Sequence, residues 1–97
     1  MIVAELKVVP IGTETPELAN YVKKAIEELK KDSRIKVSVG AMCTTLEAKD
    51  LETIFEVTKK AHEAVFSEGA QRVVTSLSID DRRDREISME SKLKSVE

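Results

Sequence analysis

The spacing of apolar residues alternates between period two and about 3.6, and this alternation restricts the chain to very few folds. Strand-like alternation covers residues 2–9, 35–39, 44–48 and 72–80. Helical spacing separates the first segment from the second, and the third from the fourth. Side chains of a strand alternate between two faces, whereas a helix repeats every 3.6 residues. The predicted order is therefore strand, helix, strand, strand, helix, strand.

This order is that of the ferredoxin-like fold, β-α-β-β-α-β, of the α+β class. It predicts a four-stranded antiparallel sheet with two helices on one face. Residues 40–43, which contain Gly40, are expected to turn the second strand into the third. Residues 86–96 carry only a thin apolar seam and predict a short polar helix in a C-terminal tail.

Both long helices carry terminal signals. Thr15 is expected to cap the first helix, with Pro16 at its first position, and its apolar face is predicted to contain Leu18, Val22, Ala25, Ile26 and Leu29. Asp50 is expected to cap the second helix and Gly69 to close it. The apolar stripe of that helix is predicted to contain Leu51, Ile54, Phe55, Thr58, Ala61, His62 and Val65.

Size and composition predict one cytoplasmic domain over residues 1–97. One cysteine, Cys43, excludes an internal disulfide and favours a reducing compartment. No apolar run approaches the length of a membrane span. The net charge is −2 with interleaved signs, and aromatic residues make up 3% of the chain, which argues against nucleic-acid binding.

The sheet face that the helices leave uncovered, here called the open face, is rich in hydroxyl groups and carboxylates. It is predicted to contain Val3, Glu5, Lys7, Val9, Lys36, Ser38, Gly40, Thr45, Glu47, Val74, Ser76, Ser78 and Asp80. One interpretation is an ordinary solvated antiparallel face. The other is a subunit interface or a pocket for a small polar or cationic molecule. Composition does not choose between them.

The residue types give little support to catalysis or to metal binding. Cys43 has no evident base, because the single histidine, His62, lies in the second helical stripe. One cysteine and one histidine are too few for a zinc site. The three glycines, at positions 12, 40 and 69, are too scattered to form a phosphate loop. We expect no catalytic residue, no metal and no cofactor.

The last strand runs into a charge cluster, IDDRRDR, over residues 79–85. Its carboxylates favour a divalent cation, but the adjoining arginines would repel one. Three arginines against three aspartates leave no positive field for nucleic acid. Mutual pairing is the better interpretation, because an arginine fork matches a carboxylate. A network across a subunit boundary would give this pairing a use.

Three stretches resemble one known family: the opening MIVAELKVVPIGT, the central HEAVFSEGAQRVVTSLSIDDRRDR and the closing SMESKLKSVE. Together they are similar to the small thiamine-binding family of the YkoF-like superfamily. The resemblance implies a ferredoxin-like fold, assembly into dimers and tetramers, no reaction, and binding of thiamine or its hydroxymethylpyrimidine moiety. It implies a pocket near the hairpin and at subunit contacts, which points to residues 42–48, where Cys43 and Ala48 depart from the residues common in the family.

A thiazolium cation joined to a flat aminopyrimidine requires hydrogen-bond acceptors and carboxylates. The expected ligand-binding residues are therefore Thr45, Glu47, Thr44, Glu5 and Ser76. The leading hypothesis is a non-enzymatic, homo-oligomeric binding protein for thiamine or its hydroxymethylpyrimidine moiety, with a role in thiamine salvage, transport or buffering. The alternative is a ligand-free oligomeric interaction or regulatory module on the same fold. An acylphosphatase-type enzyme comes third, because VPIGTETP lacks the arginine that its anion-binding turn needs.

Overall fold

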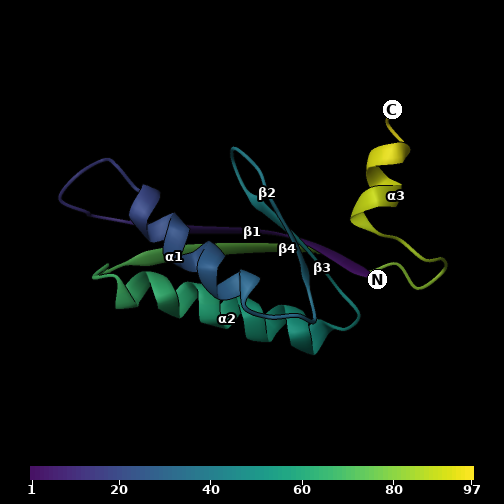
Figure 1. Cartoon of the computed structure of the whole chain (residues 1–97), viewed down its shortest axis with the longest axis horizontal. Helices are drawn as coiled ribbons and strands as arrows, with labels where there is room; N and C mark the ends of the chain where they lie inside the picture. The colour runs from purple at the N-terminus through teal and green to yellow at the C-terminus, as the bar shows by residue number, and fades with distance from the viewer.

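The computed structural model describes residues 1–97, and its elements follow the predicted order (Figure 1). The strands are β1 (Ile2–Pro10), β2 (Lys36–Val39), β3 (Thr44–Ala48) and β4 (Val73–Asp80). The helices are α1 (Ala19–Lys30), α2 (Leu51–Ser67) and a short third helix, α3 (Met89–Lys94). The predicted ferredoxin-like α+β fold with a C-terminal helix is confirmed.

The four strands form one antiparallel sheet in the order β2-β3-β1-β4. In its register, Glu5 of β1 lies opposite Thr45 of β3 on one side and Ser78 of β4 on the other. One row farther along, Val3 lies between Glu47 and Asp80. Opposed residues of an antiparallel pair share a face, so these side chains lie together on the open face.

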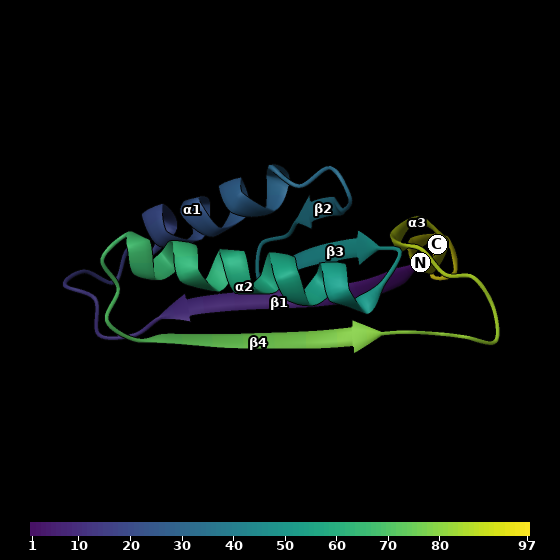
Figure 2. The ribbon, with the colours of Figure 1, turned by 90° about the horizontal axis from the view of Figure 1, so that it is seen from below.

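Both long helices cover the other face of the sheet, with α1 toward β2 and α2 toward β4 (Figure 2). The core between helices and sheet consists of Ile2, Ala4, Leu6, Ala25, Leu29, Leu46, Ala48, Ile54, Val57, Ala61 and Val65. Alternate strand residues and every third or fourth helix residue supply these side chains, which explains the two periods of the sequence.

The start of α1 was predicted wrongly. The helix begins at Ala19, and residues 15–18 precede it. The Thr15 hydroxyl accepts a hydrogen bond from the Glu17 backbone N–H at 3.2 Å, and the Glu17 carboxylate accepts one from the Ala19 N–H at 3.1 Å. These local bonds stabilise a turn around Pro16 in competition with the helix.

The signals that bound α2 were predicted correctly. The Asp50 carboxylate accepts from the Thr53 N–H at 2.8 Å, and Gly69, with φ of 106°, follows the end of the helix. The predicted apolar stripe needs one correction. Phe55 is 55% exposed, whereas Val57, which the prediction omitted, is buried. The covered side of α2 is therefore rotated toward Val57 and away from Phe55.

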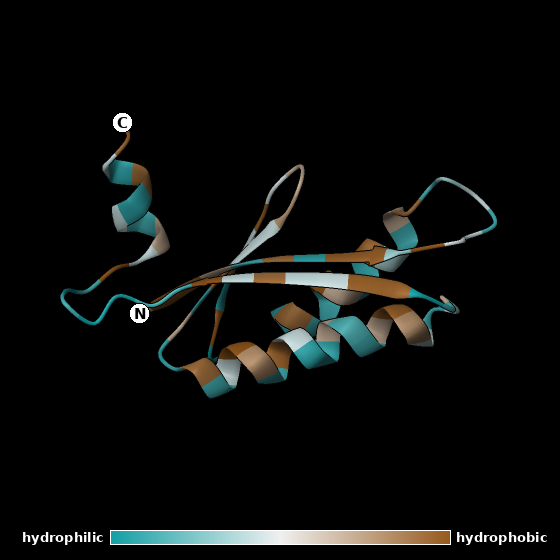
Figure 3. Cartoon of the chain, turned by 180° about the vertical axis from the view of Figure 1, so that it is seen from behind, coloured by the Kyte–Doolittle hydropathy of each residue, from teal (hydrophilic) through white to brown (hydrophobic).

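The tail, residues 81–97, crosses to the open face, where α3 lies opposite the two long helices (Figures 1 and 2). The helix itself is mostly hydrophilic and has no buried residue (Figure 3). Ile87, just before α3, is only 4% exposed, and Val3 and Glu47 of the sheet are also buried. The tail therefore covers one end of a face that the sequence predicted to be uncovered.

Candidate functional site

The open face carries a polar row where β3, β1 and β4 lie side by side. The row consists of Thr45, Glu5 and Ser78, which are direct cross-strand neighbours. Their Cβ atoms are expected about 4.5–5.5 Å apart, as in any antiparallel pair. A carboxylate is thereby held between two hydroxyl groups by the backbone register alone.

A hollow of about 300 Å³ lies over this row, between the sheet and α3, and we call it the open-face hollow. It is lined by Val3, Ala4, Glu5, Thr45, Ser78, Ile79, Asp80 and Lys92. Lys92 comes from α3 and forms an ion pair with Asp80. The hollow therefore has hydroxyl and carboxylate groups on its floor and an ammonium group on its rim.

Glu47 lies beside the hollow, but its carboxylate is hydrogen-bonded to the tail. Its side chain is 3% exposed, and its Oε1 accepts the Met89 backbone N–H at 2.8 Å. Its Oε2 lies 3.7 Å from the Lys36 ammonium. Met89 is the first residue of α3, so the carboxylate receives an N–H at the positive end of that helix. Glu47 thus attaches the tail to the sheet.

The structure brings together only some of the residues predicted for the site. Glu5 and Thr45 line the open-face hollow. Ser76 lies one row beyond them, opposite Lys7, and Glu47 lies beneath the tail. Thr44 is buried on the helix side of β3, where it borders a different cavity.

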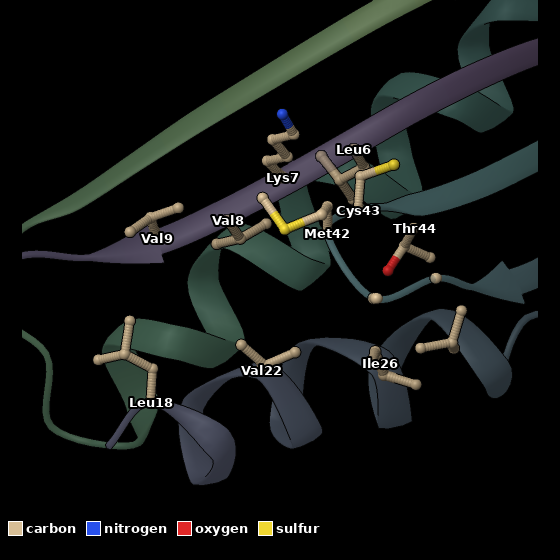
Figure 4. Close-up of a pocket in the computed structure, with 13 residues that line it drawn as sticks. Leu6, Lys7, Val8, Val9, Leu18, Val22, Ile26, Met42, Cys43 and Thr44 are labelled. Atoms are coloured by element: carbon tan, nitrogen blue, oxygen red, sulfur yellow. The ribbon is translucent and has the colours of Figure 1, made fainter. Parts of the chain in front are cut away.

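That second cavity, the hairpin groove, has a volume of about 190 Å³ and lies between β1, α1 and the β2–β3 turn (Figure 4). Figure 4 shows Leu18 just before α1, and Val22 and Ile26 along the helix, on the side of Val8 of β1 and Met42 of the turn. Most of its lining is apolar, and its only charged side chain is Lys7. The groove therefore suits an apolar group rather than a cation.

The turn beside this groove is tight. The Gly40 N–H donates to the Cys43 carbonyl at 2.9 Å, and a Cβ at Gly40 would come within 2.9 Å of the same oxygen. A side chain at Gly40 would therefore displace the backbone of the turn. Cys43 is half-buried and has no disulfide partner.

Sequence reasoning omitted the three other polar or charged residues of the hollow from the site. Ser78 and Asp80 were placed on the correct face but were not chosen, although register with Glu5 and Val3 was the signal that could have found them. No sequence pattern could have identified Lys92 as a site residue, because the sequence does not indicate where a short polar helix after the last strand will lie.

The charge cluster pairs within itself. Arg83 donates to Asp81 at 2.9 Å, and Arg82 donates to Asp84. The hydrogen bond from Arg82 lowers the pKa of the Asp84 carboxyl, and the reverse effect raises the pKa of Arg82. The predicted mutual pairing is therefore present in a single chain. Its predicted role between subunits stays a prediction.

The structure contains no cluster of side chains suited to a metal ion, and its single histidine contacts the sheet. No three His, Cys, Asp or Glu side chains gather to hold a metal ion. The Nδ1 atom of His62 lies 2.5 Å from the Thr75 hydroxyl of β4, and the ring packs edge-on against Phe66. His62 therefore contacts both β4 and its own helix α2. None of the helices is both long and apolar enough to cross a bilayer.

Comparison with known proteins identifies the family. Residues 4–97 match the family described as thiamine-binding protein. The chain belongs to the thiamine-binding protein family. A UPF0045 protein of Methanothermobacter thermautotrophicus is 47% identical over 99% of this chain and 96% of its own length. The Bacillus subtilis UPF0045 protein YqgV is 40% identical over 99% of this chain and 94% of its own.

Solved structures of similar proteins have the same fold. A hypothetical protein of Methanocaldococcus jannaschii, 44% identical, superimposes with a TM-score of 0.88 and covers 98% of this chain and 94% of its own. A Thermotoga maritima protein, 28% identical, has a TM-score of 0.82 with 99% and 98% covered. The latter is described, provisionally, as a thiamine biosynthesis or salvage protein.

Proposed function

We propose that this chain is a non-enzymatic binding protein for thiamine or its hydroxymethylpyrimidine moiety. It would act as a cytoplasmic homo-oligomer in thiamine salvage, transport or buffering. Membership of the thiamine-binding protein family supports the ligand class. The observation that carries the assignment of a site is the open-face hollow, where Glu5 is held between Thr45 and Ser78.

The hollow offers the groups that such a ligand needs. The carboxylates of Glu5 and Asp80 line the space. Because Lys92 already pairs with Asp80, Glu5 is the carboxylate that we assign to the positive charge of a thiazolium ring. The hydroxyl groups of Thr45 and Ser78 both donate and accept, so they suit the nitrogen edge of an aminopyrimidine. In this proposal Glu5 and Thr45 contact the ligand directly, and Glu47 acts through the tail that it anchors.

Charge and size favour the open-face hollow over the hairpin groove. Small-molecule pockets have volumes of about 300–1,000 Å³. The hollow, at about 300 Å³, reaches this range, and the groove, at about 190 Å³, does not. The only charged side chain of the groove is a lysine, whereas the hollow has two carboxylates against one lysine, so a cation is favoured in the hollow. Thr44 therefore has no direct contact with the ligand in this proposal.

A second candidate is the ligand-free oligomeric module. It is favoured because two carboxylates of the open face already have partners within the chain. Asp80 pairs with Lys92, and Glu47 accepts a hydrogen bond from the Met89 backbone N–H. On this alternative the tail completes the open face by itself, and the hollow is only a gap at its border. Binding measurements separate the two candidates.

The test is calorimetric titration of thiamine and of hydroxymethylpyrimidine into the wild type and Glu5→Gln. A hydrogen bond to a charged group contributes about 1.5–3 kcal/mol, so thiamine affinity should fall about ten- to a hundredfold. The neutral pyrimidine should lose less. Glu63→Gln, on α2 at the other side of the sheet, is the charge-matched control and should bind as the wild type does.

Two results would contradict the proposal. Absence of binding to the wild type favours the ligand-free module. Binding that Glu5→Gln leaves unchanged moves the ligand away from the hollow.

A further inference from the structure

The tail is attached to the sheet at two places that differ in burial. At the base of α3, Ile87 is 4% exposed, and the Met89 N–H donates to the buried carboxylate of Glu47. Beyond Met89, α3 reaches the sheet through one ion pair, between Lys92 and Asp80, and both of these side chains are more than 40% exposed. The helix is therefore fixed at its first residue and held farther along by a single exposed ion pair.

Packing adds little to this attachment of α3. None of its residues is buried, and Leu93, its one large aliphatic side chain, is 63% exposed. Its capping box joins Ser88 and Ser91, so it belongs to the helix itself and does not depend on the sheet. An exposed ion pair is weak, because water and salt screen it. Movement of α3 away from the sheet therefore costs little beyond the pairing of Lys92 with Asp80.

This ion pair lies in the open-face hollow. The charged residues that line the hollow are Glu5, Asp80 and Lys92, two carboxylates against one ammonium. Glu5 lies opposite Ser78 in the sheet, so Asp80, two residues farther along β4, is its diagonal neighbour on the same face, about 7–8 Å away. Lys7 also lies 3.9 Å from Glu5, but it does not line the hollow. The hollow thus already holds one cation of its own, close to the carboxylate that we assign to the ligand.

We propose that Lys92 is a specificity-determining residue of the hollow, because its ammonium competes with the cationic ring of the ligand. The inference rests on the proposed function and names the residue that adjusts the choice of ligand. A thiazolium ring at Glu5 and the ammonium at Asp80 are like charges within about one Debye length, which is about 8 Å at physiological ionic strength. Each therefore weakens the binding of the other, and a bound cation loosens the attachment of α3.

The coupling between ligand and helix must act in both directions. A cation in the hollow favours the state in which α3 is released, and removal of the Lys92 ammonium favours binding of the cation. A neutral pyrimidine meets no such repulsion, so its binding leaves α3 in place. Lys92 thus lowers the affinity of the hollow for thiamine without lowering its affinity for the pyrimidine moiety.

Calorimetric titration of thiamine and of hydroxymethylpyrimidine into Lys92→Met tests the competition. Thiamine affinity should rise by up to about fivefold, which is the equivalent of one exposed ion pair, whereas affinity for the neutral pyrimidine should equal that of the wild type. The gain should shrink at raised salt, because screening weakens the repulsion. Lys94→Met is the matched control, since Lys94 pairs with Glu90 inside α3 at 3.2 Å, and it should bind both ligands as the wild type does.

Amide exchange measured by NMR tests the release of α3 in the wild type. Saturating thiamine should speed the exchange of the Ser95 N–H, which donates to the Ser91 carbonyl of α3 at 3.2 Å, because a free six-residue helix is unstable. The Met89 N–H, which donates to Glu47 at the base of the helix, should keep its protection. Saturating hydroxymethylpyrimidine should leave both rates unchanged.

The possible failures are distinguishable. If the wild type does not bind thiamine, the proposed function fails, and the role of Lys92 fails with it. If thiamine binds but Lys92→Met leaves its affinity unchanged or lowers it, the competition is wrong and the proposed function stands. An equal gain for both ligands also overturns the competition, because α3 would then obstruct the hollow by its bulk and not by its charge. Exchange at Ser95 that thiamine does not speed would show that α3 stays in place.

Discussion

Replacing Glu47 by alanine is expected to detach the tail from the sheet without unfolding the domain. The carboxylate accepts the Met89 N–H at 2.8 Å from a side chain that is only 3% exposed. The other attachments include the burial of Ile87, the exposed ion pair between Lys92 and Asp80, and the ion pair between the Met1 ammonium and the Glu86 carboxylate. A six-residue helix has little stability of its own, so α3 depends on these contacts.

The size of the effect follows from the contact that is lost. A hydrogen bond to a charged group is worth about 1.5–3 kcal/mol, whereas an exposed ion pair contributes at most about 1 kcal/mol. Removing the carboxylate should therefore increase the open population of the tail about ten- to a hundredfold. Glu47→Gln keeps an acceptor for the Met89 N–H and should have a smaller effect.

Hydrogen exchange measured by mass spectrometry reports this opening directly. Peptides from residues 86–97 should exchange faster in Glu47→Ala by that factor, while peptides from β1 keep their protection. Glu90→Ala is the control, because Glu90 is exposed and forms its ion pair with Lys94 inside α3. Unchanged exchange in the tail would refute the anchoring role, and faster exchange throughout would show that Glu47 supports the whole domain.

Two further predictions concern other parts of the chain. The hydrogen bond from the Arg34 guanidinium lowers the pKa of Asp32 to about 2, so its contribution to stability is complete above about pH 4 and is lost as the pH falls toward 2. Asp32→Asn should lower Tm at pH 7 by up to about 4–8 °C, which corresponds to about 1 kcal/mol. The difference in Tm between variant and wild type should shrink as the pH falls. Thermal melts that show a constant difference at every pH would contradict the pairing. Cys43→Ser should change the free energy of unfolding by less than about 1 kcal/mol and leave thiamine affinity intact, because the thiol borders the hairpin groove and not the hollow. Loss of thiamine binding in calorimetry would instead place the ligand in the groove.

The order and type of the main elements could be predicted because local patterns carry them. Each strand alternates against one covered face, and α2 has a cap at Asp50 and a glycine at position 69 that act through nearby backbone groups. The start of α1 could not be fixed in this way. Thr15 and Pro16 fit a helix terminus and a turn equally well, and the Glu17 side chain decides in favour of a later start by accepting from Ala19.

The candidate site was predictable only as far as the strand register extends. Alternation along β1 and β3 places Glu5 and Thr45 on one face, and the sheet order then brings them together. The environment of Glu47 depends on the tail, which is attached by a backbone N–H that any residue at position 89 other than proline would provide. A contact of this kind leaves no trace in residue type, so the burial of Glu47 could not be foreseen.

Thr44 and Thr45 are consecutive residues of β3, yet they border cavities on opposite sides of the sheet. β3 is therefore a partition shared by two compartments. Because side chains alternate along a strand, a shift of β3 by one residue would exchange the two threonines between the compartments. A smaller displacement of the strand toward one side would enlarge one compartment and reduce the other, so the position of a single strand sets the dimensions of both.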